Sequence, residues 1–271
     1  MPAFTDQTGR EVILDKTPHR IISLVPSQTE LLFDLGLNNE VIGITKFCVH
    51  PEEWFQNKTR VGGTKQIKID IIHKLQPDLI IANKEENIKE QVEELGNHYP
   101  VWVSDVNNLE DAYEMIGQIG ILTDKGHVAK EMIDQIKSGF SRLPTIDSRL
   151  PTCYLIWQKP YMTAGGDTFI HSMMEAAGFK NIFFDKDRYP EIFIDDLRTD
   201  PEHESKGCQL LLLSSEPFPF KQKHVDELQP LLPNTKILLV DGEMFSWYGS
   251  RLLLAPGYFK QLRDAMDKKI N

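Results

Sequence analysis

Short apolar runs alternate with longer amphipathic stretches along this chain, and this alternation restricts its fold more than any other feature. The runs are rich in Ile, Leu and Val and occupy residues 21–25, 41–45, 79–82 and 101–104, then 153–157, 161–164, 210–214 and 237–240. Strands of a parallel sheet have this composition because helices cover both faces of such a sheet. The sequence therefore predicts an α/β protein with parallel-type sheets.

One long amphipathic stretch separates the two sets of runs. Between Asp124 and Leu143, apolar residues recur at positions 128, 132, 133, 136 and 140. This spacing places them on one face of a helix about 30 Å long. We therefore predict a first lobe over residues 1–122, a single connecting helix over 123–144 and a second lobe over 145–271.

The two halves also repeat a short pattern. Ile67-x-Ile69-Asp70-x-Ile72 in the first half corresponds to Ile192-x-Ile194-Asp195-x-Leu197 in the second, and each pattern is followed by a proline and then an apolar run. A carboxylate in the first turn of a helix is stabilised by the helix dipole. The repeat predicts two pseudo-symmetric lobes, each with an aspartate at a helix start.

Several classes of function are disfavoured by the residues. There are 30 Lys and Arg against 40 Asp and Glu, which gives a net charge of −10 and disfavours nucleic acid as a partner. No apolar run approaches the roughly 18 residues of a membrane span. Cys48 and His50 are the only closely spaced soft ligands, so no metal site is predicted. Phosphate-loop and nucleophile-elbow motifs are absent, so no catalytic residue is proposed.

Ligand-binding features are expected at the carboxyl ends of the strands. Ser27 to Glu30 follows the first run and fits a capping box, which predicts a helix start with Ser27 as its cap. Open α/β sheets bind ligands at this edge. Aromatic residues gather near the predicted strand ends and favour a flat, largely apolar ligand, with Glu243 as a polar anchor. They are Phe47, Trp157, Tyr161, Tyr189, Phe193, Phe245, Trp247 and Tyr248, of which Phe193 is expected in the core.

The chain resembles a known family most specifically in its first 83 residues. The segments that carry the resemblance are FTDQTGR at 4–10, HRIISLVPSQTE at 19–30 and LQPDLII at 75–81. They resemble the helical-backbone (class III) substrate-binding proteins of bacterial ABC importers, above all the members that bind vitamin B12. The resemblance implies two Rossmann-like lobes joined by one long helix, a corrinoid ligand in the cleft between them, no catalysis, no cofactor, a monomer outside the cytoplasm and a membrane permease as partner.

The resemblance also assigns roles to individual residues. Ligand contacts fall on Phe47, Thr64, Tyr161 or Met162, Tyr189 and Glu243, with Phe245 and Trp247 beside Glu243, and Thr64 stands where a tryptophan is expected. Trp157 joins these candidates as an aromatic residue near a strand end. The two carboxylates that bind the permease fall on Asp70 and Asp195, with Asp196 as an alternative to Asp195. Both are aspartate where the B12-binding members usually have glutamate, so each side chain is shorter by one methylene.

Two alternatives remain open from the sequence. One is an iron-siderophore or haem binder of the same class, for which Arg188 and Arg251 are available. The other is a cytoplasmic two-lobe enzyme of the chelatase or glycosyltransferase type. Residues 1–10 lack the pattern of a secretory signal, which favours this second alternative.

Overall fold

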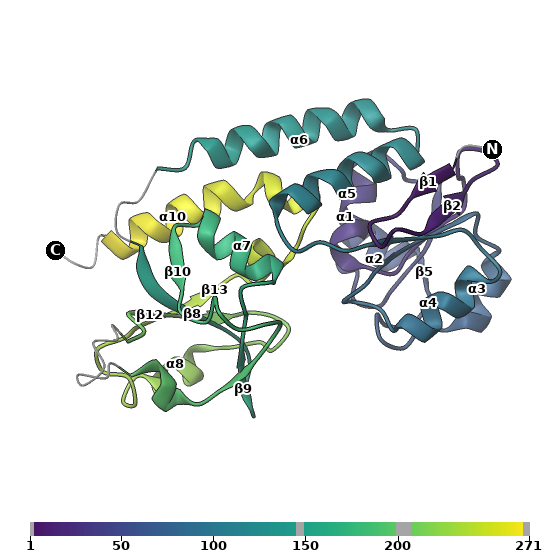
Figure 1. The fold of residues 1–271 in the computed structure, drawn as a ribbon. Helices are drawn as coiled ribbons and strands as arrows, with labels where there is room; N and C mark the ends of the chain where they lie inside the picture. Colours follow the sequence, from purple (N-terminus) through teal and green to yellow (C-terminus); the bar gives the residue numbers. More distant parts are fainter. Residues whose placement is uncertain (1–2, 145–148, 199–206, 268–271) are drawn as a thin grey trace. The chain divides into compact units, whose positions relative to one another are not determined.

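The computed structural model describes residues 3–144, 149–198 and 207–267 and divides into two compact units (Figure 1). The first unit comprises Met1–Val106, Glu110–Lys137 and Tyr248–Leu253. The second comprises Asn107–Leu109, Ser138–Trp247 and Leu254–Asn271. The α/β fold with two lobes is thereby confirmed. None of the helices in the described ranges has the length and apolar character needed to cross a membrane.

The first unit is built on a parallel sheet of five strands in the order β5-β4-β3-β6-β7. The four strands that the sequence predicts are β3, β4, β6 and β7, and the two-residue β5 is too short to produce an apolar run. The strands are β3 (Ile21–Ser23), β4 (Val41–Ile44), β5 (Thr59–Arg60), β6 (Leu79–Asn83) and β7 (Val101–Ser104). The helices are α1 (Pro26–Asp34), α2 (Glu52–Asn57), α3 (Ile69–Leu75), α4 (Lys89–Gly96) and α5 (Leu109–Leu122).

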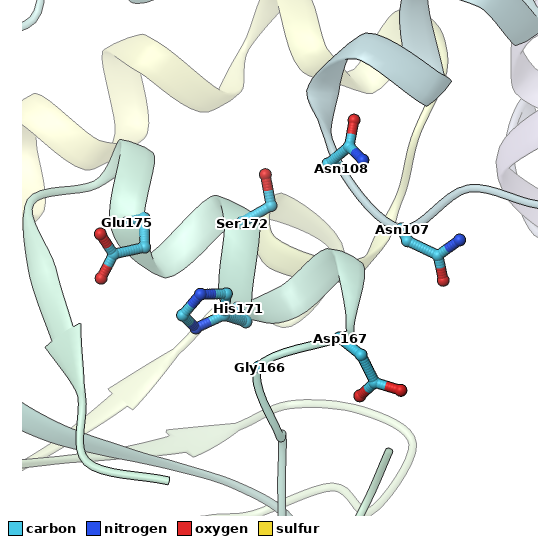
Figure 2. Close-up of a pocket in the computed structure, with 7 residues that line it drawn as sticks. All are labelled: Asn107, Asn108, Gly166, Asp167, His171, Ser172 and Glu175. Carbon is cyan, nitrogen blue, oxygen red and sulfur yellow. The ribbon is translucent and has the colours of Figure 1, made fainter. Parts of the chain in front are cut away.

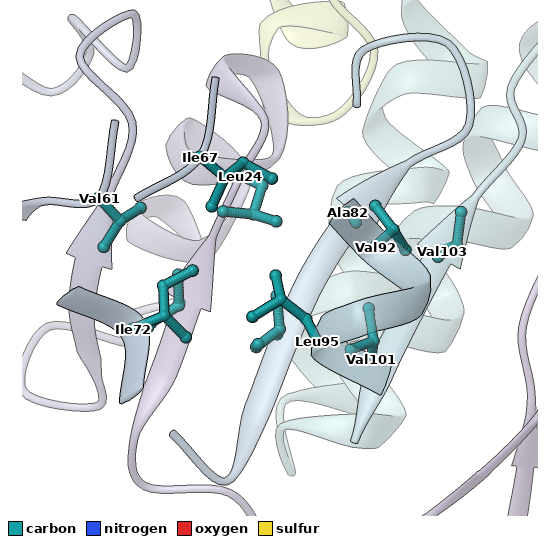
Figure 3. Close-up of a cluster of buried hydrophobic side chains, with 11 residues drawn as sticks. Leu24, Val61, Ile67, Ile72, Ala82, Val92, Leu95, Val101 and Val103 are labelled. Atoms are coloured by element: carbon teal, nitrogen blue, oxygen red, sulfur yellow. The ribbon is translucent and has the colours of Figure 1, made fainter. Parts of the chain in front are cut away.

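One face of this sheet packs on α3 and α4 (Figure 3). Leu24, Ala82 and Val103 contribute from the strands or their ends, while Ile72 and Leu95 contribute from the two helices, and all five are buried. Helix and strand side chains share this cluster because apolar residues recur at helical spacing in α3 and α4. The cluster fixes where α3 begins, and hence where Asp70 lies.

A hairpin of β1 (Ala3–Thr5) and β2 (Glu11–Ile13) precedes the sheet and is held to it by Asp6. The buried carboxylate of Asp6 accepts hydrogen bonds from the backbone N–H groups of Thr8 (2.9 Å), Arg10 (2.9 Å) and Val103 (3.2 Å). The Arg10 guanidinium also donates to it, at 2.8 Å. Burial by itself raises the pKa of Asp6, but these hydrogen bonds outweigh it and the pKa lies below its ordinary value.

Replacing Asp6 by asparagine is expected to lower the free energy of unfolding at pH 7 by about 1–3 kcal/mol, since buried donors lose a charged acceptor. Because the pKa is lower in the folded state, the carboxylate stabilises the fold above its unfolded pKa of about 3.9 and loses this effect as the pH falls through the folded value. Urea unfolding at pH 7 and pH 3 checks this. The difference between wild type and Asp6→Asn should shrink at pH 3, and the exposed Asp15→Asn control should show no difference.

The second unit contains a mixed sheet in the order β11-β9-β8-β12-β13, with β10 paired to β8. Its strands are β8 (Leu150–Trp157), β9 (Tyr161–Thr163), β10 (Phe179–Asn181), β11 (Glu191–Ile192), β12 (Leu210–Ser214) and β13 (Lys236–Val240). The helices are α7 (Phe169–Ala176), α8 (Gln222–Leu228), α9 (Glu243–Ser246) and α10 (Ala255–Asp267), with the 3₁₀ turn η1 (Ile194–Leu197). The strands β9 and β11 run antiparallel to their neighbours. Three residues link β8 to β9, too few for the crossover that parallel strands need.

The predicted connecting helix is α6 (Gly126–Ser141), which begins in the first unit and ends in the second. The units differ from the predicted lobes in two segments: Asn107–Leu109 belongs to the second unit, and Tyr248–Leu253 belongs to the first. This segment contains the turn η2 (Ser250–Leu253), where the Arg251 guanidinium donates to both carboxylate oxygens of Glu30 on α1, at 2.9 and 2.7 Å. Lobes predicted as continuous stretches of sequence place these two residues, 221 positions apart, in different lobes.

The capping-box prediction for Ser27 is wrong. Helix α1 begins at Pro26 and its cap is Val25, which makes no side-chain hydrogen bond. Proline has no N–H to satisfy and its fixed φ suits the first helical position, so the helix begins two residues earlier than predicted. Ser27 is instead a buried residue of the first turn.

Candidate functional site

The strand order identifies one edge in each sheet where a ligand is expected. In the first unit the chain passes from β3 to β4 and β5 on one side, and later adds β6 and β7 on the other. In the second unit β8 has the same position, with β9 and β11 on one side and β12 and β13 on the other. Ligands of open α/β sheets bind beyond the carboxyl ends of the strands at such a reversal.

In the first unit, Phe47 is the exposed aromatic residue at this edge. It follows β4 and is 50% exposed, and the Lys46 ammonium lies 4.9 Å from its ring centroid. Its ring lies against Gly63, where a Cβ atom would be 3.1 Å from a ring carbon. Thr64 is only 8% exposed, and its carbonyl accepts a hydrogen bond from the Asn87 amide at 3.0 Å. Phe47 therefore presents a ring surface, whereas Thr64 mainly supports the loop.

Buried polar side chains lie beneath this edge. The Gln28 amide donates to the Ser104 hydroxyl, which also accepts from the Asn83 amide at 2.9 Å. Cys48 is buried between the Thr29 and Thr45 hydroxyls, and burial raises the pKa of its thiol. A protonated thiol is a poor metal ligand. In the described part of the chain, no group of three or more His, Cys, Asp or Glu side chains is arranged to hold a metal ion.

In the second unit, Glu216 organises the corresponding edge. It follows β12, and its Oε1 accepts hydrogen bonds from the Trp247 indole N–H at 2.9 Å and from the Ser246 hydroxyl. Trp157 ends β8, is 40% exposed, and has its ring 5.7 Å from that of Phe218. The sequence argument missed Glu216. An acid three residues beyond a buried run of leucines was the available signal.

The expectation that Phe245 contacts a ligand is corrected by its burial. Phe245 has no exposed surface, and its ring centroid lies 5.0 Å from that of Tyr154 and 4.9 Å from that of Phe259. Its neighbour Trp247 is 7% exposed and is held by Glu216. The first turn of α9 directs Phe245 inward because it lies two residues from Glu243, on the other side of the short helix.

The remaining predicted ligand residues of this unit are partly buried. The hydroxyl of Tyr161 accepts from the Gln158 amide at 3.2 Å, and Met162 lies beside it on β9. The Arg188 guanidinium lies 5.8 Å from the ring centroid of Tyr189. Glu243 begins α9 beyond the carboxyl end of β13, and its backbone N–H donates to the Asp241 carboxylate at 3.1 Å. Two carboxylates therefore follow β13 directly, and Glu216 follows the neighbouring β12.

The repeated pattern has the same local position in both units, at the start of a helix or helical turn. Asp70 and Asp195 are each the second residue of a helix, α3 and η1, and both are exposed. The apolar residues that flank them, Ile67 and Ile72 in one unit and Ile192 and Leu197 in the other, are buried in the cores. The carboxylate of Asp196 accepts from the Phe193 N–H at 2.8 Å, whereas that of Asp195 forms an exposed ion pair with Arg198 at 3.0 Å. Asp195 is thus the more available of the two.

A separate hollow of about 570 Å³ lies in the second unit (Figure 2). His171, Ser172 and Glu175 of α7 line it together with Asn107, Asn108, Gly166 and Asp167. Asp167 accepts from the Arg188 backbone N–H at 2.6 Å, and Glu175 pairs with Arg149. Burial lowers the pKa of His171. None of the residues predicted to bind ligand lines this hollow.

Comparison with known proteins gives one family and several similar proteins. The chain matches a family described as periplasmic binding protein over residues 21–199. It is 28% identical to an uncharacterised ABC transporter substrate-binding lipoprotein of Bacillus subtilis, over 67% of this chain and 60% of that protein. It is 26% identical to the vitamin B12-binding protein of Vibrio campbellii, over 66% of this chain and 67% of that protein. The chain thus spans about three fifths of the length of the Bacillus relative.

Solved structures resemble the chain over nearly its whole length. A possible iron-binding periplasmic solute-binding protein of Staphylococcus epidermidis is 25% identical, with a TM-score of 0.73 over 93% of this chain and 99% of that chain. The vitamin B12-binding protein of Vibrio cholerae has a TM-score of 0.69 at 19% identity, over 91% and 98%. The haem-binding protein of the same organism has a TM-score of 0.76 at 18% identity, over 90% and 98%. The likeness to the two Vibrio structures shows the fold alone.

Proposed function

This chain belongs to the periplasmic binding protein family, and we propose that it captures a corrinoid outside the cytoplasm and delivers it to the permease of an ABC importer. The family consists of solute-binding proteins and not enzymes, so the alternative of a chelatase or glycosyltransferase is set aside. The similarity to a substrate-binding lipoprotein supports a permease as partner and a location outside the cytoplasm. The choice of ligand depends on the residues at the sheet edges.

One observation carries the choice of a corrinoid: the sheet edge of the second unit combines tryptophans with carboxylates. Trp157 supplies exposed apolar ring surface, Trp247 is mostly buried and donates to Glu216, and Glu216, Asp241 and Glu243 are acceptors within or beside the same hydrogen-bonded cluster. A corrinoid has a flat macrocycle and peripheral amides whose N–H groups donate to carboxylates. Haem and ferric catecholate siderophores carry negative charge, which these carboxylates repel.

The arginines that favoured an iron chelate are engaged elsewhere. Arg251 forms its two-pronged ion pair with Glu30, and both side chains are largely buried. Arg188 lies beside the Tyr189 ring and 3.8 Å from the Asp167 carboxylate. Haem and a siderophore are therefore included as alternative ligands in the binding test below.

Calorimetric titration with cyanocobalamin, cobinamide, haemin and a ferric catecholate tests the ligand. Both corrinoids are expected to bind the wild type, and Trp157→Ala should weaken corrinoid binding by roughly tenfold or more, as removal of an aromatic anchor does. The control Phe55→Ala removes a ring of similar exposure (38%) from α2 and should leave the affinity unchanged. If haemin or the catecholate bound and neither corrinoid did, the proposed ligand would be that compound instead of a corrinoid.

A further inference from the structure

The two equivalent aspartates lie in surroundings that differ at one exposed position. Between the buried and the partly buried isoleucine of the pattern, the first unit has Lys68 and the second has Phe193. The expectation that Phe193 lies in the core is wrong: it is 79% exposed, more than any other large hydrophobic side chain described in the structure. Since isolated exposed apolar residues are common on protein surfaces, exposure alone does not assign a role to it.

The backbone of Phe193 is held in place from both sides. Its N–H donates to the Asp196 carboxylate at 2.8 Å, and its carbonyl accepts from the Asp196 N–H at 3.1 Å. On one side Ile192 pairs with Tyr161 of β9, and on the other Leu197 is buried in the core. The ring is therefore presented to solvent from a fixed turn. Aromatic side chains held in this way lose little entropy on binding and are frequent anchors of interfaces.

The charges beside the ring indicate the chemistry of the partner. Asp195 follows Phe193 by two residues, and its exposed carboxylate forms an ion pair with Arg198 at the surface, at 3.0 Å. An exposed ion pair of this kind is weak and readily exchanged for another cation. The matching surface is therefore one that offers a cationic side chain next to an apolar recess.

We propose that Phe193 is a docking residue that inserts into an apolar recess of the permease, next to the cation that binds Asp195. The contact made by the second unit is then stronger than that made by the first, where Lys68 replaces the ring. This inference rests on the proposed function, delivery of the ligand to a permease, and on the family resemblance, which assigns permease binding to Asp70 and Asp195.

The test uses spheroplasts of the source organism that lack the chromosomal gene and receive purified protein. Phe193→Ala is expected to raise the protein concentration for half-maximal uptake of labelled cyanocobalamin by roughly tenfold or more. Its cyanocobalamin affinity and melting temperature should stay at wild-type values, because the Phe193 side chain is 79% exposed. The matched controls are Phe184→Ala, which removes a ring that is 59% exposed, and Lys68→Ala. Both should behave as wild type.

An unchanged half-maximal concentration for Phe193→Ala would overturn the inference, as would an equal effect of Phe184→Ala. Failure of the wild type itself to stimulate uptake would instead count against the proposed corrinoid function.

A second readout does not depend on the ligand. With p-benzoylphenylalanine at position 193, photocrosslinking to the permease subunit is expected, and at position 184 it is not. If position 193 gives no crosslink to the permease, Phe193 is not a docking residue.

Discussion

Replacing Asp70 and Asp195 together by alanine is expected to reduce importer-dependent uptake to the background level while ligand affinity stays unchanged. Both carboxylates are exposed at helix starts in equivalent positions of the two units. Neither lies among the residues proposed to bind ligand. The cost to the free energy of unfolding is about 0.3–1 kcal/mol for each lost helix-dipole interaction. Uptake of labelled cyanocobalamin and calorimetric titration of the same preparations measure the two properties separately.

The matched control for this variant is Glu90→Ala. Glu90 is also an exposed acid at the second position of a helix, α4, but it lies outside the repeated pattern. It should lose the same helix-dipole interaction without losing uptake. If the double variant supported uptake at the wild-type rate, the assignment of Asp70 and Asp195 to permease docking would be wrong.

Replacing Phe245 by alanine is expected to lower the free energy of unfolding by about 3–5 kcal/mol, the usual cost of removing a fully buried ring. The ring contacts those of Tyr154 and Phe259 and has no exposed surface. Its removal leaves a cavity that the strand β8 and the helix α10 do not fill. Chemical denaturation measures the loss, and titration under conditions where the variant remains folded should give wild-type affinity for the ligand.

Phe47→Ala is the control that separates a core ring from a ring at the sheet edge. Because Phe47 is half exposed, its removal should cost much less stability than that of Phe245 but weaken ligand binding. A stable Phe245→Ala variant with weakened binding would show instead that this ring belongs to the ligand site.

The location of the strands and of the aspartates follows from local sequence. Each predicted apolar run appears as a strand, and the Ile-x-Ile-Asp pattern places Asp70 and Asp195 at helix starts because the flanking Ile67 and Ile192 are buried. Burial of alternate residues is a short-range property, so it can be predicted from a few neighbouring positions. The helix between the two sets of strands was predictable for the same reason.

Only the tertiary structure decides which aromatic rings are buried and which groups pair over long distances. Phe245 and Trp157 are both rings near a strand end, yet one is enclosed by Tyr154 and Phe259 and the other is 40% exposed. The contact of Arg251 with Glu30 and the hydrogen bond from Trp247 to Glu216 join residues 221 and 31 positions apart. Such contacts depend on how strands and helices from distant parts of the chain pack together, and no local pattern of residues encodes that packing.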